Sequence, residues 1–236
     1  MFLNSYAIPN LICFTGLIAL ASFVSKKRSG SSVGLAYLVL CLSTAAWQIG
    51  TFFVLCSRSK ELALLFCRFT YLGSLFIPAT TYHFVISALG EKPRRSRVLW
   101  GIYFVWFLIF LPLSQTPWFI TGVYHYFWGY WWRSGLPHVI FLIALSIVLS
   151  LTFLKLVNSI KTAPSSIEKK RRQYLFVGLL IAYIGAIDYV PNYGVEVYPF
   201  GYIPIYLHLS IYAYVRRDEG ARHRGRGHTR NKIDLI

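Results

Sequence analysis

Long apolar runs alternate with short polar segments along almost the whole chain. Most of these runs are long enough to cross the hydrocarbon core of a bilayer as a helix, which takes roughly 20 residues. The pattern therefore predicts an all-α polytopic membrane protein, built as a seven-transmembrane helix bundle. The predicted spans are residues 6–25, 33–55, 62–89, 98–114, 137–158, 173–190 and 200–215.

Basic residues lie at the ends of alternate spans, and their placement predicts the orientation of the bundle. The loops expected on one side, together with the C-terminal tail, hold 20 of the 24 lysines and arginines. The opposite loops hold only Arg58, Lys60 and Arg133, and Arg68 lies within the third span. Because cytoplasmic loops carry such an excess of positive charge, we expect an N-terminus outside the cell (plasma) membrane and a C-terminus in the cytoplasm.

The composition fits a bilayer environment better than a nucleic-acid partner. Hydrophobic residues make up 56% of the chain and charged residues 14%, whereas soluble domains carry about 25% charged residues. The net charge of +16 would suggest nucleic acid in a soluble protein, but here the charges flank spans and face anionic lipid headgroups. We expect a membrane domain over residues 1–217. The Arg- and Gly-rich residues 218–236 are predicted to form a disordered cytoplasmic tail that anionic headgroups attract.

Two ionisable residues stand out because a charge inside a bilayer is costly. Arg68 lies about two turns inside the third span, and Asp188 lies near the corresponding end of the sixth, so both have a similar depth. Three interpretations are open: a structural ion pair, a joint site for a polar ligand, or snorkelling to the headgroups. We predict a small outward-facing cavity with Trp47 and Tyr71 in its wall and the two charged residues at its base.

The loop between the fourth and fifth spans, about residues 115–136, is rich in Trp, Tyr and Phe. Aromatic rings with a polar edge favour the headgroup layer, which predicts an interfacial belt. The alternative is a lid or wall over an outward-facing ligand pocket.

Two histidines lie inside spans, His83 in the third and His208 in the seventh. They have two interpretations, pH sensing or metal binding on one side and a hydrogen bond to a neighbouring helix on the other. The chain contains neither a phosphate-binding loop nor a cluster of metal ligands. We therefore expect no enzymatic activity, no cofactor and no metal.

Small side chains and cysteines carry weaker signals. The four cysteines lack the spacing of a zinc or redox motif, although Cys56 and Cys67 flank one short loop that a disulfide could bridge. A stripe of small residues in the sixth span favours close approach of helices in lipid. It consists of Gly178, Ala182, Gly185 and Ala186.

Three stretches together resemble a known family. They are residues 47–50 (Trp-Gln-Ile-Gly), 68–73 (Arg-Phe-Thr-Tyr-Leu-Gly) with Pro78, and 188–194 (Asp-Tyr-Val-Pro-Asn-Tyr-Gly) with 198–204 (Tyr-Pro-Phe-Gly-Tyr-Ile-Pro). Their order and spacing resemble the N-terminal seven-transmembrane sensor region of bacterial membrane histidine kinases, over about residues 1–217. The resemblance implies a sensory input whose last helix couples to cytoplasmic domains. The matching residues are Trp47, Gly50, Arg68, Tyr71, Gly73, Pro78, Asp188, Pro191, Gly194, Pro199 and Gly201.

The chain departs from that family after Arg217, because only 19 residues follow. We expect a sensor for an unidentified small ligand without its own kinase output, which signals through a separate protein, or else a remnant of a sensor kinase. The alternative from a different class is a small seven-helix transporter or permease. Transporters of that kind show repeats and paired broken helices. The sequence contains only the interruption at Pro199 and Pro204 in the seventh predicted span, with no counterpart earlier in the chain. The third hypothesis for its function is a purely structural role in the membrane.

Overall fold

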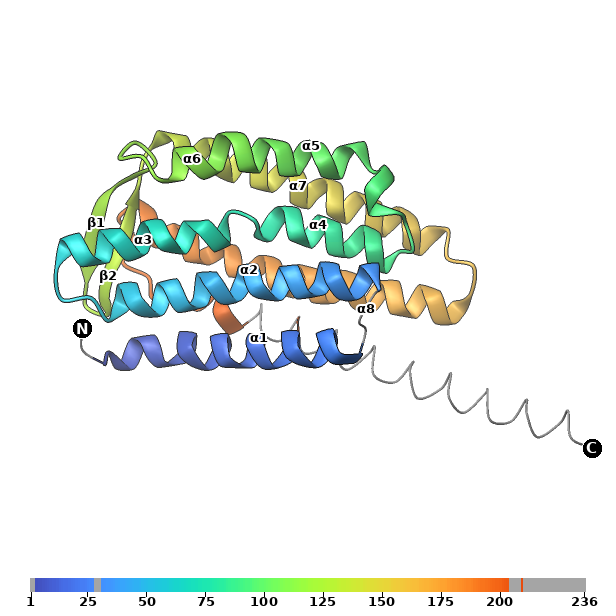
Figure 1. Ribbon diagram of the computed structural model, residues 1–236, viewed down its shortest axis with the longest axis horizontal. Coiled ribbons are helices and arrows are strands. Elements are labelled where there is room, and N and C mark those ends of the chain that lie inside the picture. Colours follow the sequence, from blue (N-terminus) through green and yellow to red (C-terminus); the bar gives the residue numbers. More distant parts are fainter. Residues whose placement is uncertain (1–2, 28–30, 204–208, 210–236) are drawn as a thin grey trace, which may run out of the picture.

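The computed structural model describes residues 3–27, 31–203 and 209, and within them six helical segments are long and apolar enough to cross a membrane. They lie side by side and run in alternating directions (Figure 1). The predicted seventh span, 200–215, lies mostly outside the described residues, as do His208 and the tail 218–236. The helices are α1 (Ile8–Lys27), α2 (Ser32–Leu55), α3 (Lys60–Ser74), α4 (Ile77–Ala88), α5 (Arg97–Val105), α6 (Leu111–Ser114), α7 (Leu136–Lys161) and α8 (Ser166–Ile184).

The two ends of the bundle differ in structure and in charge. One end carries a β-hairpin and residues 56–59 and 194–199, and we call it the hairpin end; it lies at the left of Figure 1. The opposite end, the basic end, holds residues 89–96 and 162–165 and most of the lysines and arginines of the described chain. Successive connections between the spans lie at alternate ends of the bundle, as the charge pattern predicted.

Prolines interrupt two of the predicted spans. The third span consists of α3 and α4, separated by Leu75 and Phe76, with Pro78 in the first turn of α4. In the fourth span a single π-helical turn, η3 (Trp106–Phe110), separates α5 from α6. Proline lacks an N–H and clashes with the carbonyl four residues before it, so the irregular turn that precedes Pro112 relieves this clash.

Glycines bring α2 and α3 into close contact. A Cβ atom on Gly50 would lie 2.3 Å from Thr70 Oγ1, and one on Gly73 would lie 2.9 Å from the carbonyl oxygen of Ser43. Two backbones approach this closely only where a side chain is missing. These two glycines therefore remove volume so that the helices can pack, and they leave no space for a ligand between them.

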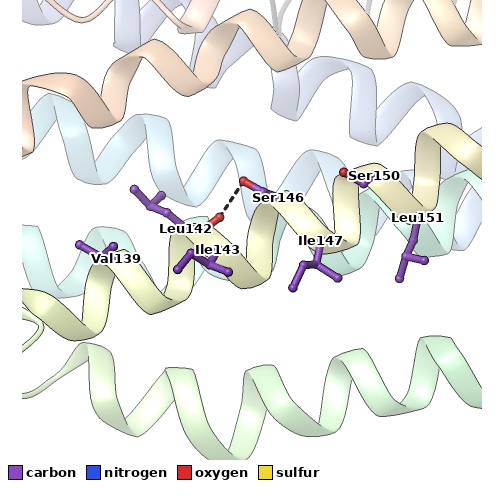
Figure 2. A pocket seen from close by; sticks show the side chains of 7 residues that line it. All are labelled: Val139, Leu142, Ile143, Ser146, Ile147, Ser150 and Leu151. Carbon is purple, nitrogen blue, oxygen red and sulfur yellow. Dashed lines mark hydrogen bonds between the residues drawn. The ribbon is translucent and has the colours of Figure 1, made fainter.

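The outward faces of the helices are apolar, as expected for contact with lipid. On α7, Val139, Ile143, Ile147 and Leu151 follow one another at every fourth position and expose 36%, 57%, 56% and 41% of their surface. Figure 2 shows this stripe along a surface groove of about 470 Å³, to which Ser146 also belongs. Ser146 Oγ donates a 2.8 Å hydrogen bond to the carbonyl of Leu142, which satisfies the hydroxyl within the helix. So large an apolar surface marks a membrane-embedded protein.

The aromatic segment between the fourth and fifth spans folds into a two-stranded antiparallel hairpin, β1 (Ile120–Tyr126) and β2 (Gly129–Ser134). It packs against α2 and α3 (Figure 1). Trp128, Trp131 and Trp132 are at most 1% exposed, whereas Trp118 before the strands is 73% exposed. The two predictions for this segment were an interfacial belt and a lid over a ligand pocket. Neither prediction included the buried tryptophans, whose rings contribute to the core of the hairpin end.

Candidate functional site at the hairpin end

A buried histidine joins two tyrosines from different elements. His138, in the first turn of α7, is fully buried. Its Nε2 lies 2.7 Å from the hydroxyl of Tyr71 on α3, and its Nδ1 lies 2.7 Å from the hydroxyl of Tyr193. Neutral imidazole has one donor and one acceptor nitrogen, so one tyrosine donates to the ring and the other accepts from it. This chain of hydrogen bonds ties α3 to α7 and to the segment that follows α8.

That segment is the 3-10 helix η4 (Gly185–Tyr193), and it also binds the hairpin. Asn192 is fully buried and accepts a 2.8 Å hydrogen bond from Trp131 Nε1. Tyr126 donates to the carbonyl oxygen of Pro191 at 2.7 Å, and burial raises the pKa of Tyr126 above its ordinary value. Asn192 Nδ2 also donates a 3.5 Å hydrogen bond to the hydroxyl of Tyr71. The hairpin, α3 and α7 therefore all make hydrogen bonds to η4 within a few residues of one another.

Asp188, on the same 3-10 helix, is paired with the backbone further along the chain. Its carboxylate is 4% exposed and accepts a 2.7 Å hydrogen bond from the backbone N–H of Gly201. A Cβ atom on Gly201 would lie 2.5 Å from the carbonyl oxygen of Gly185. Gly185, one of the four residues of the predicted small-residue stripe, thus lies in close contact with Gly201.

The structure does not bring Arg68 and Asp188 together. Within the described residues no ion pair joins them, and the carboxylate accepts a hydrogen bond from Gly201 instead. Arg68 is half-buried at the edge of the packed face of α3, and its Nε has no partner in the described part of the chain. Matching depth does not fix the direction in which a residue points around its helix, and here the two residues use different neighbours.

A small cavity lies between α2, α4, α7 and α8, and it includes one of the four predicted site residues. Its volume is about 90 Å³, and its wall contains Trp47 but neither Tyr71 nor the two charged residues. Ala182, Gly185 and Ala186 of the small-residue stripe line it, together with Tyr189. Thr44 and Thr81 also line it, among otherwise apolar side chains. This cavity has a mostly apolar wall, and Tyr71 belongs to the hydrogen-bond chain of His138. The predicted cavity with Arg68 and Asp188 at its base stays a prediction.

The remaining candidate residues lie elsewhere. His83 Nδ1 lies 3.1 Å from the hydroxyl of Tyr103, close to the basic end. Cys56 and Cys67 are free and buried, as are the other two cysteines. Among residues 3–27, 31–203 and 209, no group of three His, Cys, Asp or Glu side chains is arranged to hold a metal ion.

Sequence reasoning missed His138, Asn192 and Trp131. His138 stands at the first residues of a predicted span, next to Pro137, where a polar residue is ordinary and attracts no attention. Asn192 and Tyr193 belong to the stretch that carried the family resemblance. A search for polar residues near the ends of spans on the hairpin side would have found His138 and Asn192 together with Asp188, but not Trp131, which lies within the aromatic segment.

An apolar bundle of antiparallel helices, with a polar network at one end and positive charge at the other, defines a polytopic helical membrane protein. The family model described as the N-terminal 7TM region of histidine kinase matches residues 10–217, and the chain belongs to this family. The resemblance seen in the sequence is thereby confirmed. This region is the sensor input of histidine kinases and is distinct from their catalytic domains. No curated protein matches the chain.

Proposed function

We propose that this protein is a sensor in the plasma membrane that passes a signal from the hairpin end to a kinase unit on the cytoplasmic side. The observation that carries the proposal is the position of η4. This 3-10 helix binds the hairpin, α3 and α7, and through Asp188 it also holds Gly201. Gly201 stands at the start of the predicted seventh span, so a change at the hairpin end reaches the beginning of that span.

The input in this proposal is a small, mostly apolar molecule in the cavity beside Trp47. An apolar cavity of roughly 150 Å³ holds benzene, and this one measures about 90 Å³. A ligand of that size must displace a side chain, and Tyr189 is placed to respond because it lines the cavity. Its ring centroid lies 5.4 Å from that of His138, and it is the neighbour of Asp188 in sequence.

The proposal predicts that filling the cavity alters η4. We would compare the full-length wild type with Ala182→Phe in nanodiscs and follow amide hydrogen exchange over residues 185–203. Ala182 lines the cavity, so the added ring should push on Tyr189 and speed exchange around Asp188 and Gly201. The matched control is Val177→Phe on the same helix, where the side chain is 49% exposed to the lipid side. Equal exchange in all three proteins would contradict the proposal.

A further inference from the structure

A second cavity lies at the basic end, far along the helices from the hairpin. Its volume is about 660 Å³, and it is walled by the end of α1, the start of α2, the middle of α4 and the α4–α5 connection. The wall combines apolar side chains with a polar group of residues, which are Ser25, Ser31, Ser32, His83 and Arg94. Such a cavity at the depth where helices leave the bilayer lies in the headgroup layer and not among acyl chains.

The charge of this cavity is positive and uncompensated. Arg94, in the short 3-10 helix η2 (Pro93–Arg95), has no carboxylate within ion-pair distance among the described residues. The acidic residues of this end are engaged elsewhere. Glu91 pairs with Lys155 at 2.9 Å, and Glu168 pairs with Arg171.

Neutral polar residues line the same cavity. Ser31 caps α2 by accepting a hydrogen bond from the N–H of Gly34. The first backbone N–H groups of a helix have no acceptor within it, and Ser32, the first residue of α2, lies in the cavity wall. His83 contributes a further ring nitrogen, since its Nδ1 is bonded to Tyr103 and its Nε2 is not.

An apolar rim lies next to these donors. Leu35 and Trp100 line the cavity and are 59% and 58% exposed, and tryptophan at this depth is an interfacial anchor. A free phosphate ion has no apolar surface to pack against this rim, whereas the acyl chains of a lipid would cover it.

We propose that this cavity binds the phosphate headgroup of an anionic glycerophospholipid, with Arg94 as its charged ligand and the start of α2 as its neutral donor set. The lipid chains then run past Leu35 and Trp100. A basic pocket between helices on the cytoplasmic side is the type of site that holds anionic headgroups. This site is separate from the predicted general attraction of lipid to the tail, and it does not depend on the proposed sensing role.

The test is native mass spectrometry of the full chain in a nonionic detergent, with phosphatidylglycerol or phosphatidylcholine added. The wild type should retain one phosphatidylglycerol with at least tenfold higher affinity than phosphatidylcholine. Arg94→Gln should abolish that preference. Arg95→Gln, which removes the same charge one residue outside the cavity wall, should change the affinity by less than threefold.

A second variant keeps every charge and blocks the cavity instead. Leu35→Trp adds bulk at an exposed position, and it should weaken phosphatidylglycerol binding as strongly as Arg94→Gln does. Equal loss in Arg94→Gln and Arg95→Gln would mean diffuse attraction and overturn the proposal. Binding of inorganic phosphate as tightly as of the lipid would overturn it too, because the site would then take a free ion.

Discussion

The carboxylate of Asp188 accepts a 2.7 Å hydrogen bond from the backbone N–H of Gly201, thirteen residues further along the chain. This contact closes the loop that follows η4 and requires a residue without a side chain at position 201. A Cβ atom there would lie 2.8 Å from Asp188 Cγ and 2.5 Å from the carbonyl oxygen of Gly185.

Gly201→Ala should therefore destabilise the fold, by about 1 to 3 kcal/mol, as expected for overpacking. The measurement is the thermal unfolding midpoint of the purified chain in detergent. Gly101→Ala on α5 is the matched control, because a Cβ atom there meets nothing within 4 Å and alanine favours the helix. If both variants unfold at the same temperature, the close approach at Gly201 is not significant.

Removing the hydroxyl from either tyrosine beside His138 should lower the free energy of unfolding. Tyr71→Phe and Tyr193→Phe each delete one hydrogen bond to the ring, worth about 0.5 to 1.5 kcal/mol. In the double mutant the losses should not add, because both phenols act through one imidazole. Tyr174→Phe, at a 58% exposed position, should have no effect. If the losses of unfolding free energy in this double-mutant cycle are strictly additive, the two hydrogen bonds are independent.

The hairpin should depend on its inner tryptophans and not on the outer one. Trp131→Phe removes the hydrogen bond from Nε1 to Asn192 and leaves that buried amide oxygen without its donor, which costs about 1 to 3 kcal/mol. Trp118→Phe, at a 73% exposed position, should change the thermal unfolding midpoint little. Comparable losses in the two variants would mean that the hairpin does not pack as described.

All four thiols should be protected in the native protein. Cys13, Cys41, Cys56 and Cys67 are buried and free, and burial raises the pKa of the Cys56 thiol. A maleimide reacts with the thiolate, so the native protein should be labelled slowly. Protein that has been denatured without reductant should take up four labels. Uptake of only two labels would reveal a disulfide.

The buried thiols make a cysteine test of orientation practicable. Phe127→Cys places a thiol at the hairpin tip, where Phe127 is 67% exposed, and Arg95→Cys places one at the basic end. With the N-terminus outside, an impermeant maleimide should label the first variant in intact cells and the second only after permeabilisation. The reverse result would mean that the basic end is outside, against the positive-inside rule.

The spans and the family could be predicted from the sequence because both depend on patterns along the chain. Apolar length located the six described spans, and the stretches around Trp47, Arg68 and Asp188 identified the family. The interruptions at Pro78 and Pro112 were not predicted, although the sequence contains the residues that cause them.

The site could be predicted only in part because it depends on direction around each helix. Depth along the spans suggested that Arg68 and Asp188 meet, yet Asp188 turns to Gly201 and Tyr71 turns to His138. The hairpin escaped prediction for a different reason. Its tryptophans are amphipathic, so composition alone could not decide between the headgroup layer and the protein core.

The 3-10 geometry of η4 gives the end of the sixth span an adjustable length. A 3-10 helix rises about 2.0 Å per residue and an α-helix about 1.5 Å. Six residues of η4, Gly185 to Val190, precede Pro191, so their conversion to α-helix would shorten the rod by about 3 Å. The same conversion would rotate Asp188 about the helix axis, so these two turns of 3-10 helix would couple a shift along the axis to a rotation about it.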